Sequence, residues 1–341
     1  MKAYVLHGIN DLRYDDIEMP QLPSEDWAII KVKAAGICSS DIARVFTKGT
    51  YHFPTIPGHE FAGEVYTVGN SSYNYLIGKK VGIFPLIPCK ECEQCKNRHY
   101  EMCSNYDYLG SRRDGGFAEF VAVPIWNLIL LPDNISYSSA AMLEPLAVGI
   151  HAVKLGEINK DSETAIIGTG MIGISAAQCI KSLATKNVTV IGRNEAKKDI
   201  VERCGLGYEI CKVKEDMKQY DVIIEAVGST SAIEMAITGA KPGGTIIFMG
   251  NPTGDITLKQ DIYWKILRKQ LKIKGSWNSS YDYTNPSDWT TAVNLIATNK
   301  INIEPLISHS FTQENLKKGL NLMQEHNEPY CKVMTLWNEL K

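Results

Sequence analysis

A glycine-rich turn at residues 168–173 constrains the fold of this chain more than any other feature. The stretch GTGMIG follows the strand-like run TAII and precedes a helical run. In that context a G-x-G-x-x-G pattern marks the first turn of a nucleotide-binding βαβ unit. Its glycines permit a tight turn, close approach of the backbone to a pyrophosphate, and close packing of helix on strand. The sequence therefore predicts a parallel sheet that binds a dinucleotide.

The chain shows two different sequence patterns, one after the other. This is expected for 341 residues, because a chain of that length usually divides into two domains. Residues 1–150 carry short strand-like runs broken by Gly and Pro, which predicts a β-rich, barrel-like domain. In residues 151–285 strand-like and helical runs alternate, which predicts an α/β domain with a doubly wound parallel sheet. Residues 286–341 contain helical stretches and a final strand. Periodicity alone leaves their domain open, and we expect them to complete the first domain.

Composition and charge narrow the class of protein. The formal net charge of −2 gives no reason to expect a nucleic-acid or membrane partner. No apolar run is long enough to span a bilayer, and no signal peptide precedes the strand-like AYVLHG, so a cytoplasmic location is expected. Nine cysteines are an odd number, and four of them are clustered, which favours a metal over disulfides. The isolated ones are interpreted as packing residues: Cys179, Cys204, Cys211 and Cys331.

The clustered cysteines read C-x2-C-x2-C-x7-C within residues 88–104 and are Cys89, Cys92, Cys95 and Cys103. A tight loop can fold four thiolates at this spacing around one tetrahedral Zn²⁺. Four sulfur ligands leave no open position, so this zinc would be structural. An iron–sulfur cluster is the alternative, but that spacing usually has a shorter final gap and a following Pro, where this chain has Ser104.

Three dispersed residues outline a second, open metal site. Cys38 lies in AAGICSSD, His59 in IPGHEFAG and Glu144 in AMLEPLAVG. A catalytic zinc takes three such N, S and O donors and keeps one position open. Taken singly, each residue has an ordinary interpretation, since a His after Pro-Gly is commonly a turn residue and a Glu before Pro a helix-end charge.

Six motifs in order carry a family resemblance: GICSSD, PGHEFAGEV, the cysteine quartet, DGGFAEF, LEPLAVG and GTGMIG. Together they resemble the zinc-dependent medium-chain alcohol and polyol dehydrogenases. The resemblance implies a GroES-like catalytic domain, a Rossmann domain and a catalytic zinc in the cleft between them. Position by position it implies that Cys38, His59 and Glu144 are the catalytic zinc ligands. Glu60 matches a carboxylate that in some members binds the metal directly or through water.

The same resemblance assigns the remaining catalytic residues. Ser40 matches the hydroxyl that takes the substrate proton, and Asp41 the carboxylate that orients His59. Zinc would polarise the alcohol oxygen, and hydride would pass to a nicotinamide. Ala43 stands where many members have a relay histidine, so the proton must leave by another route.

A narrower resemblance concerns the substrate. Residues 105–120 (NYDYLGSRRDGGFAEF), residues 265–277 (KILRKQLKIKGSW) and the chain length are similar to the bacterial galactitol-1-phosphate 5-dehydrogenases. This implies a polyol phosphate, whose phosphate an arginine can hold with a fork of two donors. Arg112, Arg113 and, less directly, Arg44 are the candidates; alternatively the pair is solvated or bonded to nearby carboxylates such as Asp114.

Two other functions stay open. The first keeps the fold but takes a sorbitol-, butanediol- or threonine-type substrate. The second is a non-catalytic protein that is stabilised by a structural zinc and binds a nucleotide. Such a protein should lack the ligands of the open metal site, yet Cys38, His59 and Glu144 are all present. The family also implies a homodimer or homotetramer, with strand pairing between nucleotide domains around residues 270–285.

The strand VTVIG ends without the acid that binds the adenosine ribose in NAD-dependent relatives. Counting on from Gly173 places that acid at Gly192, with Arg193 immediately after it. A small residue followed by Arg makes room for the 2′-phosphate of NADP and supplies a counter-charge. We therefore favour NADP(H), the alternative being NAD bound through backbone contacts. Lys332 is matched to a basic residue that reaches the phosphates, and the expected cofactor contacts are Gly168, Gly170, Met171, Ile172, Gly173, Gly192, Arg193, Ala226, Val227, Met249, Gly250 and Asn251.

Overall fold

The structure, a computed structural model, describes residues 1–210, 218–282 and 286–337. The chain divides into two compact units. The first comprises Met1–Glu144, Ser280–Ala297 and Ile307–Lys341, and the second Pro145–Ser279 and Thr298–Leu306. The C-terminal segment is thus shared, since residues 298–306 belong to the second unit. Cys211 lies outside the described residues, and none of the helices within them has the length and apolarity needed to cross a membrane.

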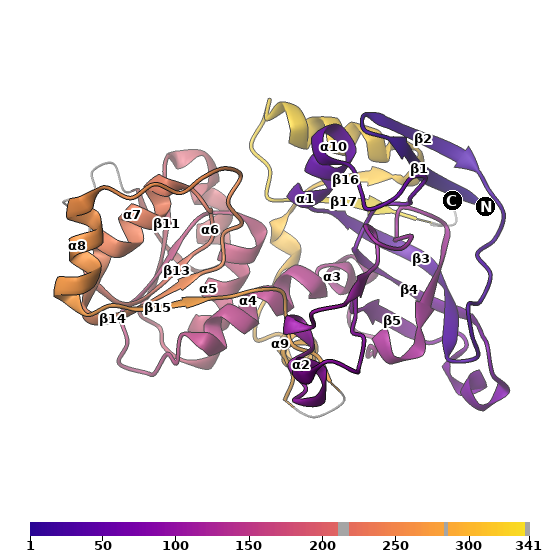
Figure 1. The fold of residues 1–341 in the computed structure, drawn as a ribbon, viewed down its shortest axis with the longest axis horizontal. Coiled ribbons are helices and arrows are strands. Elements are labelled where there is room, and N and C mark those ends of the chain that lie inside the picture. The colour runs from indigo at the N-terminus through magenta and orange to yellow at the C-terminus, as the bar shows by residue number, and fades with distance from the viewer. Residues whose placement is uncertain (211–217, 283–285, 338–341) are drawn as a thin grey trace. The chain divides into compact units, whose positions relative to one another are not determined.

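The first unit is built around a seven-stranded sheet (Figure 1). Its strands are β3 (Trp27–Ile37), β4 (Glu60–Val68), β5 (Lys80–Ile83), β8 (Phe120–Pro124), β9 (Leu128–Leu130), β16 (Ile307–Thr312) and β17 (Lys332–Leu336). The run of β-branched and small apolar residues in β3 is buried along most of its length, as suits a central strand. β3 pairs antiparallel with β4 along one edge, and with β8 and β17 along the other. The pairing with β17 brings the end of the chain beside the end of β3.

Shorter elements complete this unit. A hairpin of β1 (Lys2–Gly8) and β2 (Asp11–Asp16) packs its apolar residues into the same core as the large sheet, which includes Ile30, Phe61 and Trp337. The two-stranded sheet of β6 (Leu86–Ile87) and β7 (Asp107–Tyr108) closes the loop that carries the cysteine quartet. The helical segments are α1 (Ser39–Ala43), η1 (Arg44–Lys48), η2 (Ser71–Leu76), α2 (Glu93–Lys96), η3 (Tyr100–Met102), η4 (Ile125–Asn127), α3 (Tyr137–Ala141), α9 (Asp288–Ala297), η8 (Gln313–Asn315) and α10 (Leu316–Glu325).

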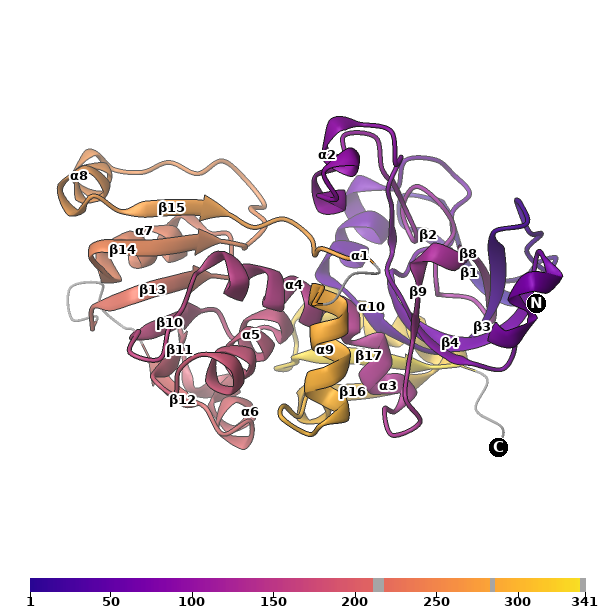
Figure 2. The same ribbon diagram turned by 90° about the horizontal axis from the view of Figure 1, so that it is seen from below.

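The second unit contains a six-stranded sheet in the order β12-β11-β10-β13-β14-β15, with every neighbouring pair parallel (Figure 2). Numbered within the unit this is the order 3-2-1-4-5-6, the doubly wound arrangement whose order reverses beside its first strand. The strands are β10 (Thr164–Ile167), β11 (Val188–Gly192), β12 (Gly207–Ile210), β13 (Tyr220–Glu225), β14 (Ala240–Phe248) and β15 (Lys272–Gly275). The helical segments are α4 (Leu143–Leu155), whose first two residues belong to the first unit, and α5 (Met171–Leu183), η5 (Glu195–Lys197), α6 (Lys198–Arg203), α7 (Thr230–Gly239), α8 (Gln260–Lys269) and η7 (Glu304–Leu306). The predicted parallel nucleotide-binding sheet is confirmed.

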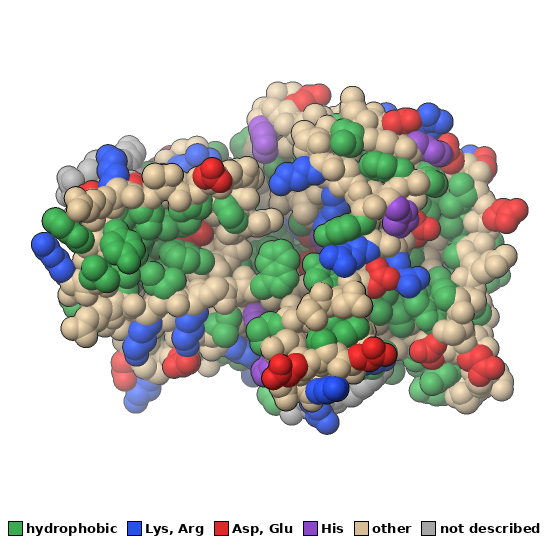
Figure 3. Space-filling view, viewed as in Figure 1, with side chains coloured by type: hydrophobic (Ala, Val, Ile, Leu, Met, Phe, Trp, Pro, Cys, Tyr) green, Lys and Arg blue, Asp and Glu red, His purple; other side chains and the backbone are tan. Residues whose placement is uncertain are grey.

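An exposed apolar face lies at the edge of this sheet. Hydrophobic side chains gather in the region of α8 and β15 (Figure 3), where Tyr263, Trp264, Leu267 and Ile273 are 53%, 44%, 56% and 39% exposed. Among the described residues β15 pairs only with β14, so its outer edge carries backbone groups available for pairing. An apolar patch beside an open strand edge is typical of a surface that another chain covers.

Candidate active site

Three potential metal ligands converge where β3 and β4 meet. Cys38 follows β3 as the N-cap of α1, His59 immediately precedes β4, and Glu60 is the first residue of β4. The antiparallel register that pairs Gly36 with Glu60 puts these positions side by side. One ligand atom from each of Cys38, His59 and Glu60 lies within 4.8 Å of the others. His59 and Glu60 are almost fully buried, so the donor atoms form an enclosed group rather than a surface cluster.

Glu144 lies beside this group without entering it. Its buried carboxylate accepts a hydrogen bond from the Tyr108 hydroxyl at 3.3 Å and interacts electrostatically with His59, Glu60 and Lys332. Burial raises the pKa of Glu144 to about 7, and His59 opposes that rise. The structure therefore brings Cys38, His59 and Glu60 together and places Glu144 as an adjacent fourth donor.

Asp41 organises the inner side of the group. One of its oxygens accepts the Cys38 backbone N–H at 3.0 Å, and the other lies 3.3 Å from His59 Nδ1 and 3.0 Å from Arg44 Nη1. Burial opposes ionisation of this carboxyl, but His59 and Arg44 outweigh it and lower the pKa of Asp41 to about 2. An ionised Asp41 holds the proton of His59 on Nδ1, which leaves Nε2 as the free ligand atom.

Glu60 is paired with a lysine from the other end of the chain. Because β17 runs beside β3, the first residue of β17, Lys332, donates to the Glu60 carboxylate and, at 3.3 Å, to the carbonyl of Ile37. Both charged side chains are at least 95% buried. Sequence reasoning assigned Lys332 to the cofactor phosphates, whereas here its ammonium group is committed to Glu60.

The charges of the group suit a divalent cation. Four groups can carry a negative charge: Cys38, Asp41, Glu60 and Glu144. Arg44 and Lys332 are cations, and His59 is neutral when it serves as a metal ligand, so two negative charges are left without a partner. Buried charges need partners, and a divalent cation among the sulfur, nitrogen and oxygen donors would supply the missing positive charge. That donor set is one that zinc accepts.

The cysteine quartet forms a second possible metal centre. The Sγ atoms of Cys89, Cys92, Cys95 and Cys103 lie within 4.8 Å of one another. Three pairs of these sulfurs are in contact, at distances of 3.5 to 3.9 Å. These separations exclude disulfides, whose sulfurs are about 2.05 Å apart. They match the edge of a tetrahedron with Zn–S of ~2.3 Å, which is about 3.8 Å. The backbone N–H groups of Cys89 and Cys92 donate to sulfurs of the quartet, which favours thiolates.

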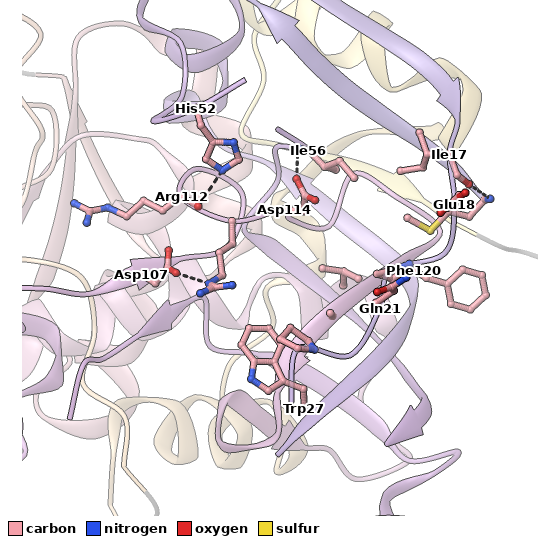
Figure 4. Close-up of a pocket in the computed structure, with 16 residues that line it drawn as sticks. Ile17, Glu18, Gln21, Trp27, His52, Ile56, Asp107, Arg112, Asp114 and Phe120 are labelled. Atoms are coloured by element: carbon pink, nitrogen blue, oxygen red, sulfur yellow. Dashed lines mark hydrogen bonds and ion pairs between the residues drawn. The ribbon is translucent and has the colours of Figure 1, made fainter. Parts of the chain in front are cut away.

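The arginine pair lies around a separate pocket of the first unit (Figure 4). This cavity of about 530 Å³ is lined by Arg112 and Arg113 but by none of the metal-site residues. Arg113 is ion-paired with Asp107 and lies over the Trp27 ring at 5.3 Å. The Arg112 guanidinium points away from Trp27 (Figure 4) and sits between two tyrosine rings, those of Tyr51 at 4.3 Å and Tyr106 at 4.4 Å.

The glycine-rich turn occupies the end of β10. Gly168 has φ of +122°, which glycine adopts without strain, and Gly170 is the N-cap of α5, the helix that begins with Met171 and Ile172. A Cβ on Gly173 would meet the Gly168 carbonyl at 2.5 Å. The remaining expected contacts follow the neighbouring strands: Ala226 and Val227 after β13, and Met249, Gly250 and Asn251 after β14. These segments all follow the carboxyl ends of the parallel strands, and dinucleotides bind at that end of the sheet in this topology.

At Gly192, the position expected to carry the ribose-binding acid, a tyrosine occupies the space that a side chain would enter. A Cβ on Gly192 would lie 2.1 Å from the hydroxyl of Tyr208, which extends from β12 and donates to the carbonyl of Asn194. No larger side chain fits at residue 192 unless Tyr208 moves. Arg193 follows at the surface and has no hydrogen bond or ion pair with the residues that the structure describes.

Comparison with known proteins identifies the family. The model of the alcohol dehydrogenase GroES-like domain matches residues 24–133, and that of the zinc-binding dehydrogenase matches residues 171–298. Galactitol 1-phosphate 5-dehydrogenase of Escherichia coli (strain K12) is 32% identical over 333 residues, covering 94% of this chain and 95% of that enzyme. This chain belongs to the zinc-binding alcohol dehydrogenase family.

Other relatives of this dehydrogenase show how broad the family is. Sorbitol dehydrogenase of Bacillus subtilis (strain 168) is 26% identical over 355 residues, covering 99% of this chain and 98% of that enzyme. The crystal structure of galactitol-1-phosphate dehydrogenase from Escherichia coli matches with a TM-score of 0.92 and 31% identity, covering 98% of this chain and all of that one. The predicted fold, the predicted zinc-dependent NAD(P)-linked dehydrogenase activity and the resemblance to the galactitol-phosphate enzymes are thereby confirmed.

Sequence reasoning missed two tyrosines of this dehydrogenase. Tyr108 bonds Glu144 and lies 5.8 Å from the His59 ring, and burial raises its pKa. The sequence could have indicated Tyr108 through its position in the aromatic run NYDY, just after the last cysteine of the quartet. Tyr208 had none, because its contact with Gly192 depends on the pairing of β12 with β11.

Proposed function

We propose that this dehydrogenase oxidises a secondary alcohol of a polyol phosphate, similar to galactitol 1-phosphate, to the ketose phosphate. Hydride passes to a nicotinamide cofactor, for which we propose NADP⁺. The observation that supports this most is the buried convergence of Cys38, His59 and Glu60, to which the Ser40 hydroxyl is connected through Arg44 Nη1. The 32% identity to a galactitol 1-phosphate 5-dehydrogenase supports the substrate class.

In this proposal each residue of the metal site has a defined task. The structure groups Glu60 rather than Glu144 with Cys38 and His59, but Glu60 is ion-paired with Lys332. Cys38, His59 and Glu144 therefore hold a zinc ion, with Glu60 as an adjacent carboxylate, and a zinc held there would act as a Lewis acid on the alcohol oxygen. Asp41 fixes the orientation of His59 through Nδ1. Ser40 accepts the substrate proton as its own hydroxyl proton passes to water, since Ala43 offers no relay imidazole. The cysteine quartet holds a second, structural zinc.

The cofactor proposal depends on the end of β11. Gly192 offers no carboxylate to bind the ribose hydroxyls, and the Tyr208 hydroxyl occupies the space that a side chain at residue 192 would enter. Such a carboxylate would also repel a 2′-phosphate. Arg193, which has no partner among the described residues, is available to bind that phosphate with paired donors.

A panel of substrates and cofactors tests both parts of the proposal. We expect higher kcat/KM for galactitol 1-phosphate than for galactitol, and for NADP⁺ than for NAD⁺. Arg193→Ala should lower kcat/KM for NADP⁺ by about 10- to 100-fold, the effect of losing a hydrogen bond to a charged group, and so reduce the preference for NADP⁺. Arg203→Ala is the matched control, because Arg203 is an exposed arginine of the same unit that pairs with Asp199.

Three results would contradict the proposal. Equal efficiency on galactitol and its phosphate would argue for a free-polyol enzyme. Higher efficiency with NAD⁺ would reverse the cofactor assignment. An Arg193→Ala variant with an unchanged NADP⁺ to NAD⁺ ratio would leave Arg193 as a solvated surface residue.

We also propose that the enzyme is a homo-oligomer that pairs through α8 and β15. The exposed side chains of Trp264 and Leu267 and the open edge of β15 support this surface. Light scattering should then give at least twice the chain mass of 37.9 kDa, and Leu267→Glu should shift the protein towards monomer. Tyr75→Glu, at a 65% exposed position of the first unit, is the control. A monomeric wild type, or a Leu267→Glu protein of unchanged mass, would exclude this interface.

A further inference from the structure

Arg44 is the one candidate phosphate residue that lies inside the metal site. It follows Ser40 by one helical turn, where α1 passes into η1, and its side chain turns back over that helix. Nη1 lies 3.0 Å from Ser40 Oγ and 3.2 Å from His59 Nδ1. Arg44 is thus in contact with the hydroxyl proposed to take the substrate proton and with a proposed metal ligand.

All these contacts use a single nitrogen of the guanidinium group. Nε and Nη2 make no hydrogen bond to any residue of the described ranges, although the side chain is only 21% exposed. These two nitrogens form one edge of the guanidinium plane, and their N–H groups are the parallel fork that matches two oxygens of a phosphate. A largely buried cation with an unused donor fork is suited to an anionic ligand.

The other cations considered are already engaged. Arg113 is 47% exposed and paired with Asp107 through Nε. Arg112 is held between two tyrosine rings, with Nη1 bonded to the Tyr106 carbonyl at 2.9 Å and Nη2 to the Tyr51 hydroxyl at 3.4 Å, so that only its buried Nε lacks a partner and it offers no fork of two donors. Lys332 is committed to Glu60. Asp41 neutralises Arg44 only in part, since the same carboxylate oxygen is shared with His59.

We infer that Arg44 is the specificity-determining residue that recognises the phosphate of the substrate through its Nε and Nη2 edge, and that Arg112 and Arg113 do not contact it. The inference rests on the proposed function, because it requires a phosphorylated substrate. Nη1 stays on Asp41 and Ser40 when the phosphate binds, so the same residue connects the anionic end of the substrate with the hydroxyl at its reacting end.

The test compares zinc-loaded wild type with Arg44→Lys and Arg44→Gln, and with Arg113→Gln as the matched control. The first measurement is the ratio of kcat/KM for galactitol 1-phosphate to that for galactitol. The second is calorimetric binding of inorganic phosphate to the zinc-loaded protein without cofactor. Zinc content and thermal unfolding establish that each variant is folded and loaded.

We expect Arg44→Gln to lower the substrate ratio and to weaken phosphate binding, each by about 10- to 100-fold, as for the loss of hydrogen bonds to a charged group. Arg44→Lys keeps the charge but not the fork and should fall between Gln and wild type. Arg113→Gln should behave as wild type in both measurements.

The possible failures are distinguishable. If wild type itself shows a ratio near one, the proposed polyol-phosphate function is wrong and this inference with it. If wild type prefers the phosphate but Arg44→Gln lowers activity on both substrates equally, the function stands and Arg44 only positions Ser40 and His59. Phosphate binding that Arg44→Gln leaves intact, or that Arg113→Gln removes, would likewise overturn the inference.

Discussion

Cys38→Ala is expected to lower kcat by about 10³-fold or more and to remove one of two zinc ions per chain. A Lewis acid contributes several kcal/mol to the transition state, and each 1.4 kcal/mol corresponds to a factor of ten. Cys38 is the only sulfur in the group it forms with His59 and Glu60, so no other thiolate of that group can replace it. Steady-state kinetics and metal analysis by plasma mass spectrometry measure the two effects together.

Two controls separate catalysis from packing. Cys179→Ala removes a buried cysteine outside both metal groups and should leave two zinc ions and most of the activity. Cys95→Ala removes a sulfur of the quartet and should also lower the zinc count to one, but its main effect should be on thermal stability. If Cys38→Ala keeps two zinc ions, or a kcat within tenfold of wild type, the metal site has been misassigned.

Lys332→Met is expected to destabilise the first unit by about 3 to 5 kcal/mol, the cost of leaving one charge of a buried ion pair without its partner. The ammonium of Lys332 and the carboxylate of Glu60 are both at least 95% buried, and Nζ also donates to the carbonyl of Ile37 at 3.3 Å. Removing the lysine therefore leaves Glu60 facing the nearby Glu144. Chemical denaturation of the zinc-loaded protein measures the free energy of unfolding.

A second substitution makes this prediction specific to the pair. Glu60→Gln combined with Lys332→Met removes both charges and should recover a large part of the lost stability, since replacing a whole buried pair is often nearly neutral. Lys2→Met, which breaks an exposed pair with Asp16, should leave the stability close to wild type. A Lys332→Met protein whose unfolding free energy is within about 1 kcal/mol of wild type would show that the pair contributes little.

Residues close in the sequence were predictable because short-range geometry positions them. The four cysteines lie within one loop, so their spacing alone restricts how their sulfurs can meet, and the structure places the sulfurs at tetrahedral separations. The turn from β10 to α5 is similarly local, because positive φ at Gly168 and close packing at Gly173 depend on neighbours a few residues away. The change from short strands to alternating strands and helices likewise predicted the two architectures.

Other parts of the site depend on strand pairings between distant segments. Lys332 meets Glu60 because β17 lies beside β3, and Tyr208 closes residue 192 because β12 lies beside β11. No local sequence pattern predicts either strand register. From the sequence, Arg112 and Arg113 were preferred to Arg44 as phosphate residues, with a nearby carboxylate such as Asp114 as the alternative partner; tertiary structure identified the tyrosine rings and Asp107 as the partners.

The sequence by itself therefore determined the family, the two folds and the residue types of both proposed metal centres. Tertiary structure decided which charges are paired, which cation keeps a fork of two unused donors within the metal site, and which side chain occupies the space beside Gly192. The physical reason is that periodicity and motif spacing record contacts within a turn or a loop. The partner of a buried charge is determined by long-range strand register, which brings Lys332 to Glu60 across 272 positions of the sequence.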